Sequence, residues 1–329
     1  MATLTLAQAE YLVVSALMRS RTSAENAASV ARALVGAEAD GLKGHGLSRV
    51  PMYAAQAKVG KVDGLAVPSI TRPRPGLIAV DAAHGFAFPA IEAAEALLPG
   101  SARAQGVAAA AIHRSGHCGA AGQAVERLAE AGLVALMFVN TPFAIAPWGG
   151  SKAVFGTNPL AFACPLPGRA PLVVDLSVSK VARGNVAMAK QRGETIPEGW
   201  ALDDHGRPTT DPDAALRGTM LPMGDAKGTA LALVVELLAA GLTGANFAAE
   251  ASSYLDSQGP PPGTGQLLIV FDPAAFGGGA EARFAMLADS IEAQPGARLP
   301  GSRRLQSRAK VQAEGLHISD ALLKEIEAA

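Results

Sequence analysis

Cysteine, long apolar runs and excess charge of either sign are all scarce in this 329-residue chain. Its two cysteines, Cys118 and Cys164, cannot build the disulfide framework of a small secreted protein. The N-terminus lacks the basic start and apolar core of a signal peptide, and no apolar run reaches the ~18 residues that a membrane helix needs. Lys plus Arg total 28 against 29 Asp plus Glu, with no basic stripe. We therefore expect a soluble, cytoplasmic protein with no nucleic-acid and no membrane partner.

Several familiar catalytic and ligand-binding motifs are also missing. The chain has no Gly-x-Gly-x-x-Gly fingerprint, no phosphate-binding GxxxxGK[ST] loop and no GxSxG nucleophile elbow. It has neither the HExxH nor the CxxC pair of common metal sites, so we expect no metal. A Rossmann dinucleotide site, a P-loop and a serine hydrolase are therefore disfavoured.

The apolar pattern predicts a mixture of helices and strands. Only 5% of the residues are aromatic against 49% apolar, which suits tight helix–sheet packing by small side chains. The first 60 residues have helical spacing and a capping box at Thr5 and Gln8, and residues 60–76 predict a linker. The later runs alternate too irregularly for simple βαβ units, so we predict an α/β or α+β fold. Strands are expected at 77–80, 108–112, 133–139, 160–164, 171–175 and 266–271, and helices at 88–105, 119–132, 228–242, 280–293 and within 315–329.

Residues 41–50 place an imidazole and a guanidinium four residues apart among three glycines. If a helix continues from His45, Arg49 lies on the same face one turn later. A fixed cation could then bind a carboxylate while a titratable group beside it exchanges a proton. The alternative is a glycine-rich turn that carries two solvated polar residues.

A second glycine-rich stretch, residues 115–122, joins a predicted strand to a predicted helix and contains His117 and Cys118. Free amides at a helix start attract anions, so this stretch is a candidate ligand loop. The alternatives are a neutral His117 bonded to a backbone carbonyl and a Cys118 that is a small buried thiol rather than a nucleophile.

Four further segments are candidate anion or cofactor contacts. We expect Asn158 to be extended because Pro159 follows it, which would fix the direction of its amide. Hydroxyls and cations follow a strand end at 175–185, Lys227 opens an apolar helix, and three arginines surround a Pro-Gly turn at 298–304. Helix capping, turns and surface charge explain these segments equally well.

Taken in order, these segments resemble the malate/L-lactate dehydrogenase type 2 family. That family also contains sulfolactate and ureidoglycolate dehydrogenases and the Δ1-piperideine-2-carboxylate/Δ1-pyrroline-2-carboxylate reductases. The resemblance covers residues from about 5 to about 305. The segments that carry it are GHGLSRVPMY, SGHCGAAG, APWGG, FGTNPLAFACP, DLSVSKVARGN, PMGDAKG and RLPGSRR.

The resemblance implies an NAD(P)H-dependent oxidoreductase whose cofactor domain is not a Rossmann fold. It is expected to contain a mainly antiparallel mixed sheet beside a helical N- and C-terminal region, in a homodimer. Residues 1–72 with about 305–329 would form the helical substrate and dimerisation region. Residues 73–304 would form the sheet region, with the cofactor-binding core at about 120–275.

The resemblance also implies roles for individual residues. His45 matches the family's proton donor, Arg49 its grip on the substrate carboxylate, and His117 a residue that lines the substrate pocket. The expected cofactor contacts, to which the helix start adds Lys227, are Thr157, Asp175, Leu176, Ser177, Arg183, Gly184, Lys227, Arg298, Gly301, Ser302, Arg303 and Arg304.

Two positions depart from the family pattern and guide the choice of substrate. Gly44 stands where a serine often precedes the histidine, and Asn185 stands where a carboxylate often completes a relay. A ketone needs an acid to protonate its oxygen, whereas a cyclic imine arrives as an iminium ion. We therefore predict reduction of Δ1-pyrroline- or Δ1-piperideine-2-carboxylate to L-proline or L-pipecolate. The expected cofactor is NADPH, and NADH is the alternative. The alternatives are a 2-hydroxy-acid dehydrogenase of malate or lactate type and a catalytically inactive structural dimer.

Overall fold

A seven-stranded mixed sheet forms the centre of the computed structural model, which describes residues 1–329 except the side chain of Gln191. Only β3 and β4 run parallel, and the other neighbouring strands are antiparallel. This confirms the predicted mixed, mainly antiparallel sheet. In spatial order the strands are β2 (Ser69–Arg74), β3 (Leu77–Asp81), β4 (Val107–Ser115), β11 (Thr264–Phe271), β5 (Val134–Val139), β6 (Leu160–Leu166) and β7 (Arg169–Leu176).

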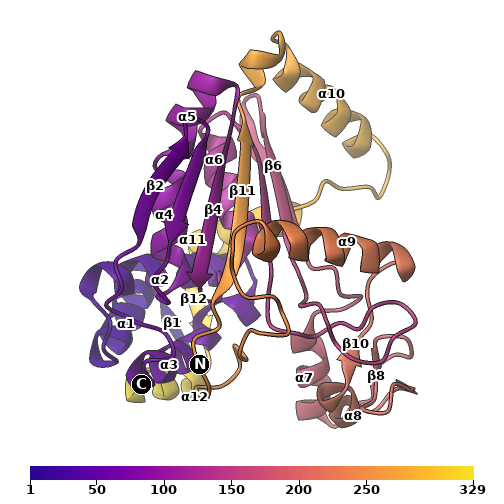
Figure 1. Ribbon diagram of the computed structural model, residues 1–329. Coiled ribbons are helices and arrows are strands. Elements are labelled where there is room, and N and C mark those ends of the chain that lie inside the picture. Colours follow the sequence, from indigo (N-terminus) through magenta and orange to yellow (C-terminus); the bar gives the residue numbers. More distant parts are fainter.

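Helices cover both faces of this sheet (Figure 1). Behind it pack α4 (Ala87–Glu95), α5 (Leu98–Gln105) and α6 (Ala121–Glu130), against alternate strand residues such as Ile112, Met137 and Leu268, which are fully buried. In front of it crosses α9 (Ala226–Glu236), which continues into the π-helical turn η3 (Leu237–Gly241). In β4 burial alternates from one residue to the next, because successive side chains point to opposite faces of the sheet.

The two ends of the chain meet in a separate helical layer. There β1 (Ala2–Leu4) pairs with β12 (Leu316–Ile318), and the Thr5–Gln8 capping box starts α1 as predicted. Val13, Leu34 and Ile326 are fully buried in its core. The domain boundaries at 72 and 305 stay predictions. The helices of this layer are α1 (Leu6–Arg19), α2 (Ala24–Ala39), α3 (Val50–Val59) and α12 (Asp320–Ala328).

A third, smaller core surrounds Ile145, Val178 and Val186 and lies at the lower right of Figure 1. It contains α7 (Arg183–Arg192), α8 (Pro212–Arg217) and a small sheet of β8 (Ala201–Leu202), β9 (Pro208–Thr209) and β10 (Thr219–Met220). The remaining elements are α10 (Ala280–Glu292), α11 (Ser302–Glu314) and the 3-10 turns η1 (Lys43–His45), η2 (Leu47–Arg49) and η4 (Pro273–Phe276).

Several local predictions were wrong. The single helix expected at 88–105 is two helices, α4 and α5. The supposed linker at 60–76 contains β2, which is an edge strand and therefore tolerates Pro73. The arginine-rich turn at 298–304 is not wholly a loop, because α11 begins at Ser302.

None of the helices among the described residues is both long and apolar enough to span a membrane.

Candidate active site

Two histidines from distant parts of the chain lie side by side. His45 ends η1, and His117 follows the last residue of β4 by two positions. Their ring centroids are 5.5 Å apart and the planes differ by 9°. Glu38 of α2 fixes the first loop, because its Oε2 accepts the Leu47 N–H at 2.9 Å. A Cβ at Gly46 would collide with Glu38, so this close approach requires glycine.

The predicted helical continuation from His45 to Arg49 was wrong. Two 3-10 turns replace it, and Gly46 separates them with φ −99° and ψ −140°. The chain therefore folds back, and Arg49 Nε donates to the Gly44 carbonyl at 2.7 Å. No carboxylate of the described residues forms an ion pair with Arg49, so its charge is free for a ligand.

Both rings are held neutral. Burial, and secondarily the charge of Arg49, lowers the pKa of His45 to about 4. Burial, Arg49 and His45 together lower the pKa of His117 well below its ordinary value. Desolvation disfavours the charged imidazolium, and a neighbouring cation adds to that effect. At pH 7 Arg49 is therefore the only one of these three groups that carries a charge.

Two tyrosines lie against the histidine pair. The Tyr53 hydroxyl lies 2.5 Å from His117 Nδ1, so Nδ1 meets this hydroxyl rather than the backbone carbonyl of the alternative interpretation. The ring of Tyr254 contacts His117 edge-on, with centroids 5.0 Å apart. Tyr53 could have been found, because it lies four residues after Arg49 in the same motif. Nothing near Tyr254 in the sequence links it to the histidines.

Cys118, next to His117, is the small buried thiol of the alternative interpretation. Burial raises its pKa to about 12, which keeps the thiol protonated and unsuited to nucleophilic attack.

Asn185 lies apart from the histidine pair. It is exposed in the first turn of α7, in the third core, and among the described residues no hydrogen bond joins its side chain to His45. Within one chain the two relay positions, Gly44 and Asn185, are thus not brought together.

In three of the expected cofactor contacts the side chain is hydrogen-bonded to another residue of the chain. Arg304 Nη2 donates to Glu126 Oε1 at 2.9 Å, and Arg183 Nη2 donates to the Leu216 carbonyl at 2.9 Å. Asp175 Oδ2 accepts the Gly122 N–H at 2.7 Å, which caps the start of α6.

The other expected contacts follow strand ends or helix starts. The hydroxyls of Ser177 and Ser179 lie 2.9 Å apart just after β7, and Arg298 and Arg303 are exposed. The remaining positions are Thr157 after Gly156, Leu176 at the end of β7, Gly184 in α7, Lys227 in the first turn of α9, and Gly301 and Ser302 at the start of α11.

Asn158 is not extended as predicted, because its φ is +40°. Its Nδ2 donates to Glu236 Oε2 at 2.7 Å and to the Ala232 carbonyl at 3.0 Å. The amide therefore binds a buried carboxylate of α9 instead of facing a ligand.

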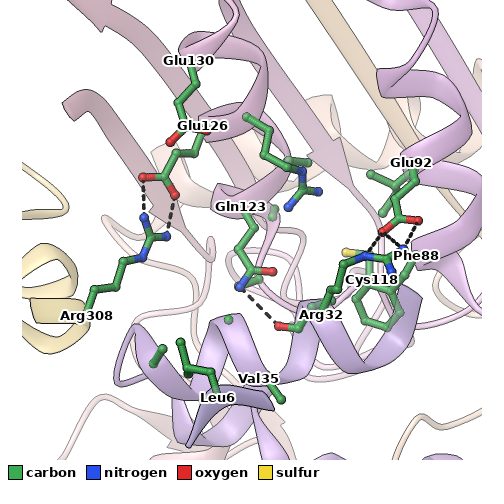
Figure 2. A pocket seen from close by; sticks show the side chains of 18 of the residues that line it. Leu6, Arg32, Val35, Phe88, Glu92, Cys118, Gln123, Glu126, Glu130 and Arg308 are labelled. Carbon is green, nitrogen blue, oxygen red and sulfur yellow. Dashed lines mark hydrogen bonds and ion pairs between the residues drawn. The ribbon is translucent and has the colours of Figure 1, made fainter. Parts of the chain in front are cut away.

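A separate cavity of about 400 Å³ lies between the helical layer and α4, α6 and α11 (Figure 2). Neither His45, Arg49 nor His117 lines it, although Cys118 does. Gln123 spans it by donating to the Ala33 carbonyl, and its arginines point to carboxylates. The histidine pair is thus a distinct site.

Two stacked histidines beside an arginine without a carboxylate partner, on a mixed sheet flanked by helices, form an arrangement typical of enzyme sites that bind an anion. The model of the malate/L-lactate dehydrogenase family matches residues 4–327, and the chain belongs to this family of oxidoreductases.

Relatives with two kinds of substrate are similar to it. The chain is 51% identical to the (2R)-3-sulfolactate dehydrogenase (NADP(+)) of Chromohalobacter salexigens, over 99% of this chain and 97% of that one. It is 42% identical to the Δ1-pyrroline-2-carboxylate/Δ1-piperideine-2-carboxylate reductase of Pseudomonas putida, over 94% and 89%.

A solved structure agrees with the second relative. The Δ1-piperideine-2-carboxylate reductase of Pseudomonas syringae superimposes with a TM-score of 0.95 at 40% identity, covering 100% of this chain and 99% of that one.

Proposed function

We propose that the protein reduces Δ1-pyrroline-2-carboxylate or Δ1-piperideine-2-carboxylate to L-proline or L-pipecolate with NADPH. The observation that carries this proposal is the stacked pair of histidines beside an arginine that has no carboxylate partner among the described residues. His45 and His117 are neutral, and Arg49 is an uncompensated cation beside them. The reductases from two Pseudomonas species, at 42% and 40% identity, support the same substrate class.

The neutral histidines favour an iminium over a ketone. Reducing a ketone creates an alkoxide, and a neutral imidazole is a poor acid because it would have to become an imidazolate. An iminium ion already carries its proton on nitrogen, and it would be repelled by a charged His45. Burial is the larger cause of the low His45 pKa, so a carboxylate bound at Arg49 would remove only the smaller cause.

The residues of this chain then have separate tasks. Arg49 binds the substrate carboxylate, and the rings of His45, His117 and Tyr254 exclude water around the imine carbon. When bound, NADPH supplies a hydride. The ring nitrogen keeps the proton with which it arrived, so the product is the secondary amine and no protein acid is consumed.

The donor set fits an anionic dinucleotide. The start of α11 has no side-chain cap, and the side chain of Arg303 in its first turn is exposed. The hydroxyls of Ser177 and Ser179 supply further donors near the end of β7. We propose that Ser302 and Arg303 hold the extra phosphate of NADPH, whereas Arg304 is occupied by Glu126.

We also propose that the protein is a homodimer. Exposed apolar side chains on α9 and η3 support this, namely Leu233, Val234, Leu237 and, just beyond, Leu242, which are 45–67% exposed. Light scattering of the purified protein tests it, and a mass of about 33.3 kDa, that of one chain, would contradict it.

A second candidate, a 2-hydroxy-acid dehydrogenase, is favoured by the 51% identity to the sulfolactate enzyme. Sulfolactate carries a sulfonate as well as a carboxylate, and Arg49 is the cation that acts on both histidines. One free cation matches one carboxylate better than a doubly charged substrate.

The deciding experiment follows NADPH absorbance with both imines, oxaloacetate, pyruvate and 3-sulfopyruvate, and repeats the series with NADH. We expect kcat/KM for an imine to exceed that for every keto acid by about a hundredfold, roughly 2.7 kcal/mol. A keto acid that wins would make the protein a hydroxy-acid dehydrogenase. No turnover of any substrate would favour the inactive dimer.

A further inference from the structure

Two of the chain's three tyrosines converge on His117, and this is more than the proposed reaction requires. Tyr53 comes from α3, and Tyr254 comes from an irregular segment roughly 200 residues later in the chain. The third, Tyr11, is 76% exposed on α1. The two tyrosine rings at His117 therefore need a structural explanation.

The direction of the Tyr53 hydrogen bond determines where His117 carries its hydrogen. Tyr53 is buried, and burial raises its pKa, so the phenol stays protonated. Among the described residues the only acceptor for its hydroxyl is His117 Nδ1, at 2.5 Å. A buried O–H that has one acceptor donates to it. Nδ1 is then the unprotonated nitrogen, and the single N–H of the neutral ring is at Nε2.

Packing holds Tyr53 in that position. Its ring lies against Phe86 and Phe88, with centroids 5.6 and 6.2 Å away. Because Tyr53 is only 2% exposed, its hydroxyl cannot turn from His117 toward solvent.

Tyr254 is held by hydrogen bonds at its hydroxyl and at its backbone carbonyl. Its hydroxyl lies 2.5 Å from Thr264 Oγ1, which in turn donates to the Ser115 carbonyl at 3.2 Å, at the end of the strand that leads to His117. Its backbone carbonyl accepts from Gln56 Nε2 at 3.2 Å. Gln56 lies three residues after Tyr53, so the two share one face of α3.

Lys61, just after α3, completes the tether. Its side chain is fully buried, and Nζ donates to the Ser253 carbonyl at 2.7 Å, the Asp256 carbonyl at 3.1 Å and Asp256 Oδ1 at 3.0 Å. All three ammonium hydrogens are thus used to hold the residues on either side of Tyr254. A buried charge with this many internal partners serves position rather than exchange with solvent.

We propose that Tyr53 and Tyr254 are positioning residues that keep His117 in a single tautomer, with its hydrogen on Nε2, and that Lys61 acts through Tyr254. His117 then offers bound substrate a neutral hydrogen-bond donor whose direction is fixed before binding. The inference rests on the proposed function, since it assigns a task to His117 in that pocket. The groups that face His117 are Arg49, His45, Tyr53 and Tyr254.

The first test is made on the wild-type protein without substrate. Long-range ¹H–¹⁵N spectra of protein labelled in histidine distinguish the two neutral tautomers, and loss of signals in His117→Gln assigns the residue. We expect the Nε2–H pattern for His117 at pH 7. An Nδ1–H pattern, or an averaged mixture, would overturn the proposal.

The second test separates positioning from stability. In Tyr53→Phe we expect a mixed tautomer signal, a kcat lowered about tenfold and a KM changed less than about twofold. Lys61→Met should broaden the His117 signals and lower kcat in the same direction. Tyr11→Phe is the matched control and should change neither. A thermal midpoint is measured for each variant, and unchanged tautomer and kcat in a folded Tyr53→Phe would refute the role.

The two proposals fail in different ways. The spectra need no substrate, so they test the tautomer independently of the reaction. If His117 carries its hydrogen on Nε2 and the protein prefers keto acids, the imine proposal is refuted and the positioning proposal stands. An Nδ1–H His117 in an efficient imine reductase would do the reverse.

Discussion

Arg49 at the histidine pair and the two arginines at the junction of α2, α6 and α11 differ in whether a carboxylate of the protein neutralises them. Arg49 donates to a single backbone carbonyl, and no carboxylate of the described residues pairs with it. Arg304 and Arg308 share Glu126, and Arg308 also binds Asp40. The first arrangement leaves a positive charge for a ligand, whereas the second compensates its charges internally and joins three helices. A guanidinium therefore serves binding only where the protein does not neutralise it.

Removing the free cation should give the largest effect on activity. In Arg49→Met we expect kcat/KM for the carboxylate substrate to fall about a thousandfold, ~4 kcal/mol, since a charged hydrogen-bonded pair with substrate is lost. Arg74→Met is the control, because Arg74 is exposed on the edge strand β2 and bonds only the neighbouring Pro73 carbonyl. Steady-state kinetics on both variants measure the difference. Equal kinetics in the two would refute the role of Arg49.

Removing the shared carboxylate should instead change stability. Glu126→Gln leaves two arginines without their common partner, and we expect the free energy of unfolding to fall by about 3 kcal/mol in urea titrations. Glu314→Gln breaks an exposed pair with Lys310, for which we expect a loss under ~0.5 kcal/mol. If Glu126→Gln were no less stable than Glu314→Gln, the junction would not hold the helices together.

The neutral state of His45 predicts a loss of stability in acid. Above its ordinary pKa of 6.5 the histidine is neutral in both folded and unfolded chains, so it costs nothing there. Between pH 6.5 and about 4 the unfolded chain binds a proton that the folded protein does not, and stability falls. We expect this histidine to contribute roughly 3 kcal/mol of that loss by pH 4.

The acid loss should be smaller in His45→Gln by this amount and unchanged in His205→Gln, whose ring is exposed. Urea unfolding at pH 7 and pH 4 measures it in both variants. The same acid loss in His45→Gln as in the wild type would show that other groups cause it.

The smallest expected effect concerns the exposed arginine at the start of α11. Arg303→Gln should raise the KM for NADPH about tenfold, ~1.4 kcal/mol, and leave that for NADH unchanged. Arg72→Gln on β2 is the exposed control. A KM for NADH that rises in parallel would assign Arg303 to a part of the cofactor that both nucleotides share.

Local patterns predicted the parts of the molecule that depend on local chemistry. The capping box at Thr5 and the strand expected at 108–112, which lies within β4, follow from neighbouring residues alone. The state of Arg304 could not be predicted, because its partner Glu126 lies 178 residues away and only the fold brings them together.

Tyr254 escaped prediction for the same reason, since its place beside His117 depends on a buried Lys61 and an irregular segment. The strand β2 was missed because Pro73 argues against a strand except at a sheet edge, and edges are a property of the whole sheet.

The pairing of β1 with β12 has a consequence for how the protein is made. Thr3 and His317, 314 residues apart, are bonded across this pair. The layer that carries Arg49 and Tyr53 therefore cannot complete its core until residues 316–326 have been synthesised. A nascent chain that still lacks them has the whole central sheet but not the finished floor of its pocket. Although α1, α2 and α3 are synthesised first, they are therefore among the last elements to finish packing.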